Sequence, residues 1–528
     1  MHGRRSRFTF LAKLLVATLF VLATDWLFEG CRIGSWLGAL AFAWALASAI
    51  VRPAVRRGPS RVALLIAGGF ALVLAYDPGL LAWALFWTAL SIATLLPRTD
   101  GFDDAWRWMV RLLAHALTGP LTPLSDLPRL FRSRPHQGRL TMRALVVMLA
   151  LPLAMSALFV ALFARANPLI AHAFAHIELP TLGEAAFWLL ILATVWPSLR
   201  PHRWATRLAT SMPAAKVTLP GASLPSVLVS LVLFNAVFAV QNGLDIAFLW
   251  SDASLPAGVS LAEYAHRGAY PLIVTALLAG VFVLATMKPG SATAGSPAIR
   301  RLVILWVAQN LLLVASSILR TCDYIAVFML TAWRLAALAW MALVGLGLVL
   351  ICWRMLTGRS ARWLINCNAL AALLVLTVSS IIDLDAAAAA WNVRHAREVG
   401  GRGVALDLCG LHQLGPAALL PLIEFEQGRL DPRFRDRVRS VRQQILVGDV
   451  DWQTSLVARQ SNWRTWTWRD ATRLDAARQL LGPHPGEPLP IPAGATRDCD
   501  GAVELPPPPP PTTPPPAPTL PLTKAPGA

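Results

Sequence analysis

The chain has 528 residues, of which 56% are hydrophobic and only 14% are charged. Soluble domains carry about 25% charged residues, so this composition excludes an ordinary soluble enzyme and indicates that lipid is the solvent. The formal net charge of +18 is typical of nucleic-acid-binding proteins, and its meaning here depends on where the charges lie.

Apolar runs follow one another along most of the chain, each close to the length that crosses roughly 30 Å of hydrocarbon. Their approximate bounds are 11–28, 34–51, 61–76, 79–96, 142–163, 183–198, 225–249, 268–287, 301–319, 332–353 and 363–383. The first run has no small-residue cleavage site after it, so we interpret it as a helix that stays in the protein. The sequence therefore predicts an all-α, polytopic bundle of eleven transmembrane helices.

Basic residues alternate between successive predicted loops. If the N-terminus is cytoplasmic, the inner segments hold 26 basic residues, and the outer loops hold four, which are Arg32, Arg165, Arg267 and Arg320. The positive-inside rule then gives an N-in, C-out protein of the bacterial inner membrane. The same distribution explains the net charge, because inner-face lysines and arginines attract anionic lipid headgroups. We therefore expect the bilayer and its headgroups as partners, and no nucleic acid.

The long inner loop contains an amphipathic stretch, FDDAWRWMVRLLAHAL. One helical face carries Phe102, Trp106, Met109, Leu113 and Leu117, and the other carries Asp103, Arg107 and Arg111. Two readings remain open: a helix that lies in the headgroup plane, or a helix that packs under the bundle.

Four regions follow from these patterns. We expect four spans with the inner loop (1–141), a seven-helix membrane region (142–384), a small extracytoplasmic helical domain (385–484) and a disordered proline-rich tail (485–528). Cys409 and Cys499 both fall in the predicted outer part, where a disulfide between them is allowed.

Polar side chains inside the predicted spans are the leading candidates for a site. Such groups are costly in hydrocarbon and either hold helices together or mark a ligand pathway, and both readings are open here. The candidates are Arg334, Gln241, Asn242, Asp245, Gln309 and Asn310, with Glu263, Tyr264 and Arg267 in an outer loop. Arg334 has a second reading, in which its side chain reaches the outer interface near Tyr324.

Metal and cofactor sites are not expected. His172, His176 and Glu178 form HxxxHxE in an outer loop, but no third ligand is evident and incidental histidines are the simpler reading. The six cysteines form no CxxC pair, and no phosphate loop, HExxH or GxSxG motif is present.

Three stretches resemble the DUF4173 family of bacterial membrane proteins, which is related to DUF4153. They are PAGVSLAEYAHRGAYPLI (256–273), RTCDYIAVFMLTAWRLAALAWM (320–341) and the run from WNVRHA to LDLCGLHQLGPAALLPL (391–422). Phe328–Met329 departs from the Tyr-Gly that the family usually has, and Cys409–Gly410 stands where an aromatic is usual. The resemblance covers about 225–425 and implies architecture without an activity.

Three functions are compatible with these features. The leading hypothesis is a non-enzymatic membrane protein that transports or senses a solute through a polar intramembrane cavity. The second is a lipid-linked transferase that uses the outer-face carboxylates Asp25 and Glu29, and the third is an envelope scaffold that recruits partners through its C-terminal domain.

Overall fold

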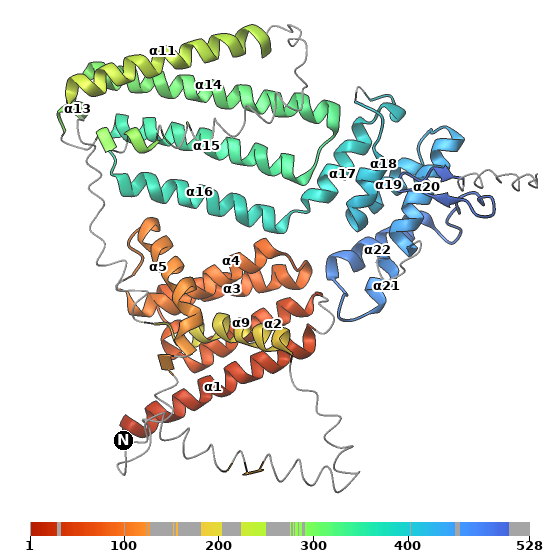
Figure 1. Ribbon diagram of the computed structural model, residues 1–528, viewed down its shortest axis with the longest axis horizontal. Coiled ribbons are helices and arrows are strands. Elements are labelled where there is room, and N and C mark those ends of the chain that lie inside the picture. Colours follow the sequence, from red (N-terminus) through yellow and green to blue (C-terminus); the bar gives the residue numbers. More distant parts are fainter. Residues whose placement is uncertain are drawn as a thin grey trace, which may run out of the picture. The chain divides into compact units, whose positions relative to one another are not determined.

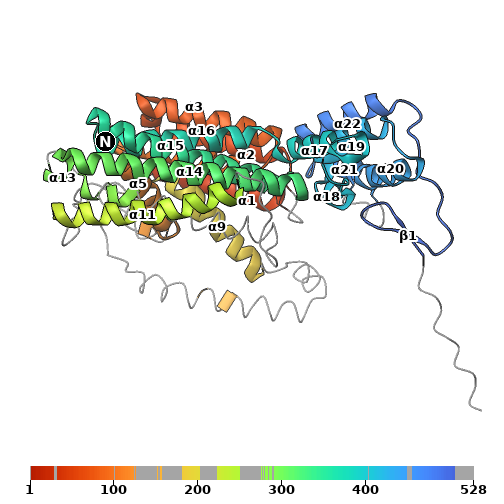
Figure 2. The same cartoon turned by 90° about the horizontal axis from the view of Figure 1, so that it is seen from above.

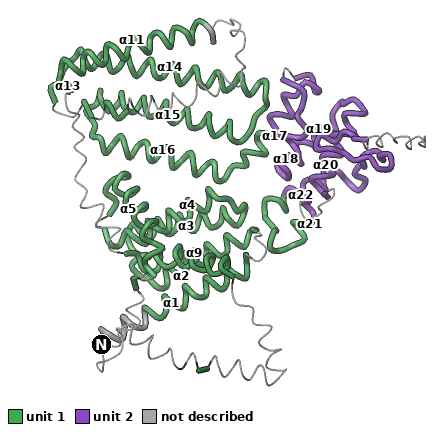
Figure 3. The backbone as a smooth tube through the Cα atoms, viewed as in Figure 1, with its two compact units in different colours: residues 1–388, 459–472 green, residues 389–458, 473–528 purple. Residues whose placement is uncertain are grey.

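A computed structural model gives the fold. It describes residues 2–28, 33–99, 101–123, 125–126, 152, 155–156, 181–202, 223–249, 291–401, 403–448 and 455–505, with scattered positions between 275 and 287. The chain forms two compact units, residues 1–388 with 459–472, and residues 389–458 with 473–528 (Figure 3).

Unit 1 is a bundle of long apolar helices, as the sequence predicts. The helices of the described part are α1 (His2–Leu27), α2 (Trp36–Val51), α3 (Pro59–Tyr76), α4 (Leu80–Leu95), α5 (Ala105–Thr118), α9 (Leu182–Leu199), α11 (Leu224–Leu249), α13 (Ala292–Gly295), α14 (Pro297–Phe328), α15 (Ala332–Thr357) and α16 (Ala361–Ile381). Short 3-10 turns occupy Pro53–Arg56, Leu96–Arg98 and Gly119–Leu121. Eight of these helices are long and apolar enough to cross a membrane, and α2 is a shorter apolar helix.

The apolar side chains that these helices leave exposed indicate that lipid surrounds them. Only 6% of the α16 window is buried inside the protein, although its mean hydropathy is 1.9. A surface of that kind is stable only against hydrocarbon, because exposing it to water would cost about 25 cal/mol for every Å². The protein is therefore a multi-pass membrane protein. Nine of the eleven predicted spans are helices here, and the segments 142–163 and 268–287 lie mostly outside the described residues.

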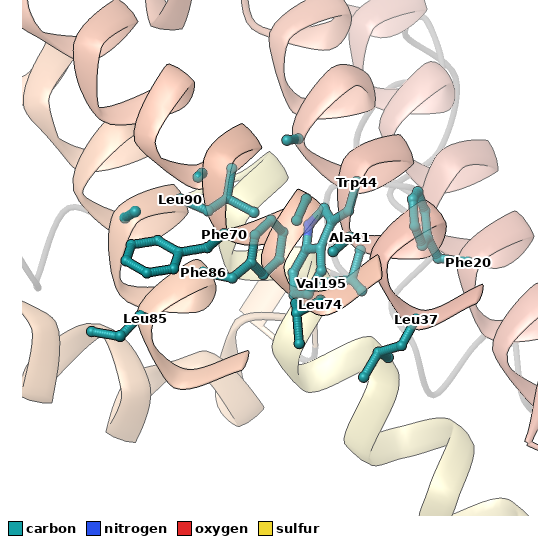
Figure 4. Packing of buried hydrophobic residues seen from close by; sticks show 14 of the residues in the cluster. Phe20, Leu37, Ala41, Trp44, Phe70, Leu74, Leu85, Phe86, Leu90 and Val195 are labelled. Atoms are coloured by element: carbon teal, nitrogen blue, oxygen red, sulfur yellow. The ribbon is translucent and has the colours of Figure 1, made fainter. Parts of the chain in front are cut away.

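Helices α1, α2, α3, α4 and α9 share one core, which is centred on Trp44 (Figure 4). The Trp44 ring packs against Phe20 and Phe86, and its indole nitrogen donates a hydrogen bond to Ser198 Oγ at 2.7 Å. A buried tryptophan N–H is more stable with an acceptor, and the Ser198 hydroxyl on α9 supplies one.

Small residues let α2 and α3 approach closely. A Cβ atom added at Gly38 would lie 2.2 Å from the backbone nitrogen of Ala75, so no larger residue fits without moving the helices apart. Ala41, Ala45 and Ala49 continue this buried face toward the end of α2. Helix pairs in lipid associate through such close backbone packing.

Helix α5 is amphipathic, as the sequence predicts, and its packing against unit 1 involves one face. Trp108, Arg111 and His115 are buried on the side that faces the rest of unit 1. The apolar face predicted from the sequence, which includes Trp106, Leu113 and Leu117, is exposed. The helix thus packs on the bundle through one face and presents an apolar strip of the kind that lies in a headgroup layer.

Helices α11, α14, α15 and α16 form a second group in unit 1. Figures 1 and 2 show them side by side, with α14 between α11 and α15. Helix α14 is 32 residues long and extends well past residue 319, where the sequence placed the end of the ninth span.

The helix ends of unit 1 gather on two opposite sides. On the predicted outer side, residues 459–472 contact the end of α16 and the turns between α1 and α2 and between α3 and α4. Arg469 pairs with Asp77 at 2.7 Å and with Asp383 at 3.6 Å, and Ser35 N donates to Trp466 O. On the predicted inner side, the Arg52 guanidinium at the end of α2 donates to Thr94 O and Ser198 O, near the ends of α4 and α9.

Two contacts give the directions of further helices in unit 1. Helix α9 starts near the end of α1, where Trp188 donates to Asp25. Helices α11 and α14 run parallel, since Asn235 contacts Leu302 and Asp245 contacts Arg320. The count of eleven spans stays a prediction, because two of the predicted spans fall mostly outside the described residues.

Unit 2 is a small helical unit. Its elements include α18 (Leu408–Gln413), α19 (Leu419–Glu426), α20 (Pro432–Val447) and the short antiparallel pair β1 (Thr496–Arg497) and β2 (Val503–Glu504). Helices α17 (Leu384–His395) and α22 (Trp468–Leu481) each have residues in both units, and α21 (Leu456–Ser461) precedes α22. Two further 3-10 turns occupy Arg397–Val399 and Gly415–Ala418.

A disulfide joins Cys409 to Cys499 in unit 2. The Arg497 guanidinium pairs with Asp436 at 2.7 Å, and the backbone of Gly486 accepts a hydrogen bond from Arg442. The sequence placed the start of a disordered tail at residue 485, and the structure differs, because 485–505 are packed onto α20. The prolines of this segment do not prevent the packing, because side chains of α20 make the contacts. Residues 506–528 lie outside the described part.

Burial of His115 makes stability depend on pH. Desolvation, with Arg52 and Arg98 nearby, lowers the pKa of this imidazole to about 4 from 6.5. The unfolded chain then binds the proton more readily than the folded chain, so stability is complete above pH 6.5 and is lost as the pH falls toward 4. We expect a loss of about 3 kcal/mol over that window at His115. Melting temperatures in detergent should therefore fall less steeply with acidification in His115→Gln than in the wild type, and equal slopes would contradict this assignment.

Candidate functional site

The buried face of α11 changes character along its length. Val227 and Leu231 are apolar, whereas Asn235, Asn242 and Asp245 further along the same face are polar and buried. The spacing of seven and then three residues keeps these side chains on one side of a helix. From Asn235 to Asp245 the face rises about 15 Å, from near the middle of the span to its predicted outer end.

Helix α14 supplies the partners of this polar face. Gln309 Nε2 donates to Asn235 Oδ1 at 3.0 Å, and Asn242 Nδ2 donates to the backbone oxygen of Gln309 at 3.2 Å. Asn235 Nδ2 also reaches Leu302 O at 3.1 Å. We call the set Asn235, Asn242, Asp245, Gln309 and Arg320 the polar seam.

An ion pair between Asp245 and Arg320 forms the predicted outer end of the polar seam. The two side chains are 3% and 8% exposed, and Gln241 Nε2 donates to the same carboxylate oxygen at 3.0 Å. The sequence assigned Arg320 to an outer loop, and that assignment is wrong: α14 continues for two more turns beyond it. An arginine inside an apolar helix needs a counter-charge, and Asp245 provides it.

Several acceptor oxygens of the polar seam have no donor. In the described part of the chain, Asp245 Oδ2, Asn242 Oδ1 and Gln309 Oε1 are buried without a hydrogen-bond partner. An unpaired polar atom in a low-dielectric interior costs about 1 to 3 kcal/mol. These three atoms are all acceptors, so a proton donor or a cation would satisfy them.

Arg334 holds a turn and has no contact with the polar seam in the described structure. Its guanidinium donates to Phe328 O at 2.5 Å and to Met329 O, and it lies 4.4 Å from the centre of the Tyr324 ring. These are the last carbonyls of α14 and the start of the link to α15. The described contacts of Arg334 are therefore with this turn and with the Tyr324 ring.

The turn that Arg334 holds has an unusual backbone. Met329 has φ of 64° and ψ of 171°, a region that glycine adopts readily and other residues avoid. The family that this segment resembles has glycine at the corresponding position. The two carbonyl contacts from Arg334 support the turn in spite of the methionine side chain.

The remaining sequence candidates fall into three groups. Asn310 is buried, but its amide donates to Trp306 O in its own helix, so it does not join the polar seam. Glu263, Tyr264 and Arg267 lie outside the described residues, as do His172, His176, Glu178 and Glu29. The carboxylate of Asp25 accepts a hydrogen bond from Trp188 at 2.8 Å. Within the described residues, no group of three or more His, Cys, Asp or Glu could hold a metal.

Sequence reasoning missed two members of the polar seam. Asn235 carries a periodic signal, since it lies seven residues before Asn242 on the same face. The end of the apolar run at 319 predicts a loop at Arg320. The signal for its true position is Asp245, since an acidic residue inside an apolar helix favours a basic partner on a neighbouring helix.

A separate apolar cavity of about 410 Å³ lies between α15 and α16. Trp340, Leu343 and Leu364 are among its lining residues, and Asn368 is a polar residue at its wall. The amide of Asn368 is already bonded to Leu364 O, so the cavity offers few polar contacts to a ligand.

One comparison with known proteins identifies a family for this chain. A family model described as "Domain of unknown function (DUF4153)" matches residues 9–425. The match starts in α1, well before the resemblance seen from about residue 225, and it includes the whole polar seam. No curated protein and no solved structure matches the chain.

The ion pair makes a direct prediction for stability. Asp245→Asn should lower the free energy of unfolding by about 3 to 5 kcal/mol, because it leaves the Arg320 charge buried without its partner. The double variant Asp245→Asn with Arg320→Gln should recover most of that loss, since neither charge then remains. Melting in detergent would compare them, and a double variant less stable than both single variants would contradict the pairing.

The turn at Met329 predicts a stabilising substitution. Met329→Gly should raise stability by about 1 to 2 kcal/mol, because glycine relieves the unfavourable backbone conformation and gives back only part of the gain as chain entropy. Arg334→Gln removes the carbonyl contacts, and it should lower the free energy of unfolding more in the wild type than in the glycine variant. Equal costs in the two backgrounds would show that Arg334 does not support the turn.

Proposed function

Since the chain belongs to the DUF4153 family, whose activity is unknown, we propose a function from the polar seam itself. The protein transports or senses a small cationic or proton-donating solute, which enters the seam from the outer side of the bacterial inner membrane. The role is non-enzymatic. The observation that carries the proposal is the set of unpartnered acceptor oxygens beside the buried Asp245–Arg320 pair.

The chemistry of the unpaired atoms supports a cation or proton donor over an anion. Arg320 is neutralised by Asp245, so the positive charge that an anion would need is already engaged. Asp245 Oδ2, Asn242 Oδ1 and Gln309 Oε1 are carboxylate and amide oxygens, which are the ligands that hard monovalent and divalent cations prefer.

The depth of the polar seam supports entry from the outer side. Its charged end lies near the end of α11, and its amides extend from there to the middle of the helix. Toward the other end of α11, Val227 and Leu231 are fully buried and apolar, so the polar contacts stop there. Intramembrane charges arranged in this way are typical of ion and substrate pathways.

Two finer assignments complete the proposal. We place the chain in the DUF4173-type branch of its family, on the three stretches quoted above, including Arg334. The bilayer is its principal partner, with anionic headgroups on the cytoplasmic face, and no cofactor is required.

Ion-dependent stability tests the proposal. We expect sodium or potassium chloride to raise the melting temperature of the purified protein relative to choline chloride at equal ionic strength and constant pH. Ligand present at a hundredfold excess over its Kd contributes on the order of 2.7 kcal/mol. Gln309→Leu and the double variant Asp245→Asn with Arg320→Gln should lose that response while remaining folded.

Ser317→Ala is the matched control. Its hydroxyl is buried on α14 but donates to Leu313 O in its own helix, so the substitution removes a polar group without altering the polar seam. This variant should respond like the wild type. If the wild type gains nothing from either salt, or if the double variant responds as strongly as the wild type, the seam only holds helices together.

A further inference from the structure

A cluster of basic side chains occupies the predicted inner end of the N-terminal bundle. Lys13 in α1 lies within electrostatic range of Arg52, Arg98 and Arg200, which follow the ends of α2, α4 and α9. In the described part of the chain, Asp126 is the one carboxylate that acts on Lys13. We call these four cations the inner basic cluster.

Each arginine of the inner basic cluster is fixed by the fold. Arg52 donates to Thr94 O at 3.0 Å and to Ser198 O at 3.2 Å, and Arg98 donates to Pro201 O. Arg200 pairs with Asp126 at 3.0 Å and lies over the Phe10 ring at 5.3 Å. The positive groups are therefore held in place before any ligand arrives, which lowers the entropic cost of binding.

The described contacts offset part of this charge. Three helices end here, and each C-terminus offsets about half a positive charge. The Asp126 carboxylate pairs with Arg200. Four cations this close together attract an anion, and salt screens the attraction poorly where the side chains are partly buried.

Lys13 is the member best placed to bind a ligand. Its ammonium makes no hydrogen bond or ion pair with the described residues, although the side chain is half-buried. It lies within the first turn of the apolar stretch of α1, about 4.5 Å along the helix from Phe10, at the depth where headgroups meet hydrocarbon. A lysine ammonium offers three donors and binds phosphate as a point charge.

We infer that the inner basic cluster is a binding site for a phosphate group, carried by an anionic lipid headgroup or by a soluble phosphate. Lys13 and the outward-facing parts of Arg98 and Arg200 contact the phosphate oxygens. Arg52, with both carbonyl contacts made, contributes its charge. The site is separate from the polar seam and does not depend on its function.

Melting of the purified full-length protein in neutral detergent tests the site. One arm compares sodium phosphate with sodium chloride at equal sodium concentration and ionic strength. The other compares added phosphatidylglycerol with phosphatidylcholine. If only phosphatidylglycerol stabilises the protein, the ligand is a lipid headgroup. If inorganic phosphate also stabilises it, the site binds soluble phosphate too.

Variants separate a discrete site from general surface charge. Lys13→Gln should weaken the apparent affinity roughly tenfold, the effect of losing a charge-assisted hydrogen bond. Lys13→Arg keeps the charge and should bind within about twofold of the wild type, which also shows that position 13 tolerates substitution. Arg61→Gln is the matched control, because Arg61 is exposed on the same side and outside the cluster.

Two results would overturn the inference. The first is the absence of stabilisation by both phosphatidylglycerol and inorganic phosphate in the wild type. The second is an equal loss of affinity in Lys13→Gln and Arg61→Gln, which would show that the attraction is spread over the whole basic face.

Discussion

Hydrocarbon offers no hydrogen bonds, and the protein must therefore pair its own polar groups. This requirement explains why helices make up the membrane region and why threonine side chains such as Thr24 bond to the preceding turn. It also explains the arginine contacts: Arg52 and Arg334 satisfy carbonyls at helix ends, and Arg320 finds a carboxylate. Where pairing is complete, a polar group needs no role beyond structure. The polar seam is the described region where buried carboxylate and amide oxygens inside the spans remain without partners.

This distinction changes which candidate residues matter. The Arg334 guanidinium makes its described hydrogen bonds to the backbone of the turn at Met329 and none to the polar seam. Asp245 is paired through one oxygen and unpaired through the other, so its contacts do not account for it. The inner basic cluster, by contrast, brings four cations near one described carboxylate. The two proposed sites would thus bind ligands of opposite sign.

Hydropathy and loop charge predicted the architecture well, because spans of about 20 apolar residues are the strongest signal a sequence carries. The bounds of α11, α15 and α16 came within a few residues of prediction. The sequence does not show whether Arg320 lies in a helix or in a loop. A 32-residue helix contains the same apolar run as a shorter helix that is followed by a basic loop. The partners of Asn235 and Asp245 depend on which helices are neighbours, and that information is tertiary. Residues 485–505 were misjudged because prolines reveal nothing about packing against α20.

The most direct test of the account measures whether the polar seam opens to the outer side. Asn242→Cys and Asn235→Cys would be treated in intact cells with a small, membrane-impermeant thiol reagent, beside Ser317→Cys on the internally bonded part of α14. If the seam opens to the outer side, Asn242→Cys reacts fastest, Asn235→Cys reacts more slowly, and Ser317→Cys is protected. Equal protection of all three positions would contradict an open seam and would leave the α11–α14 contacts as helix packing alone.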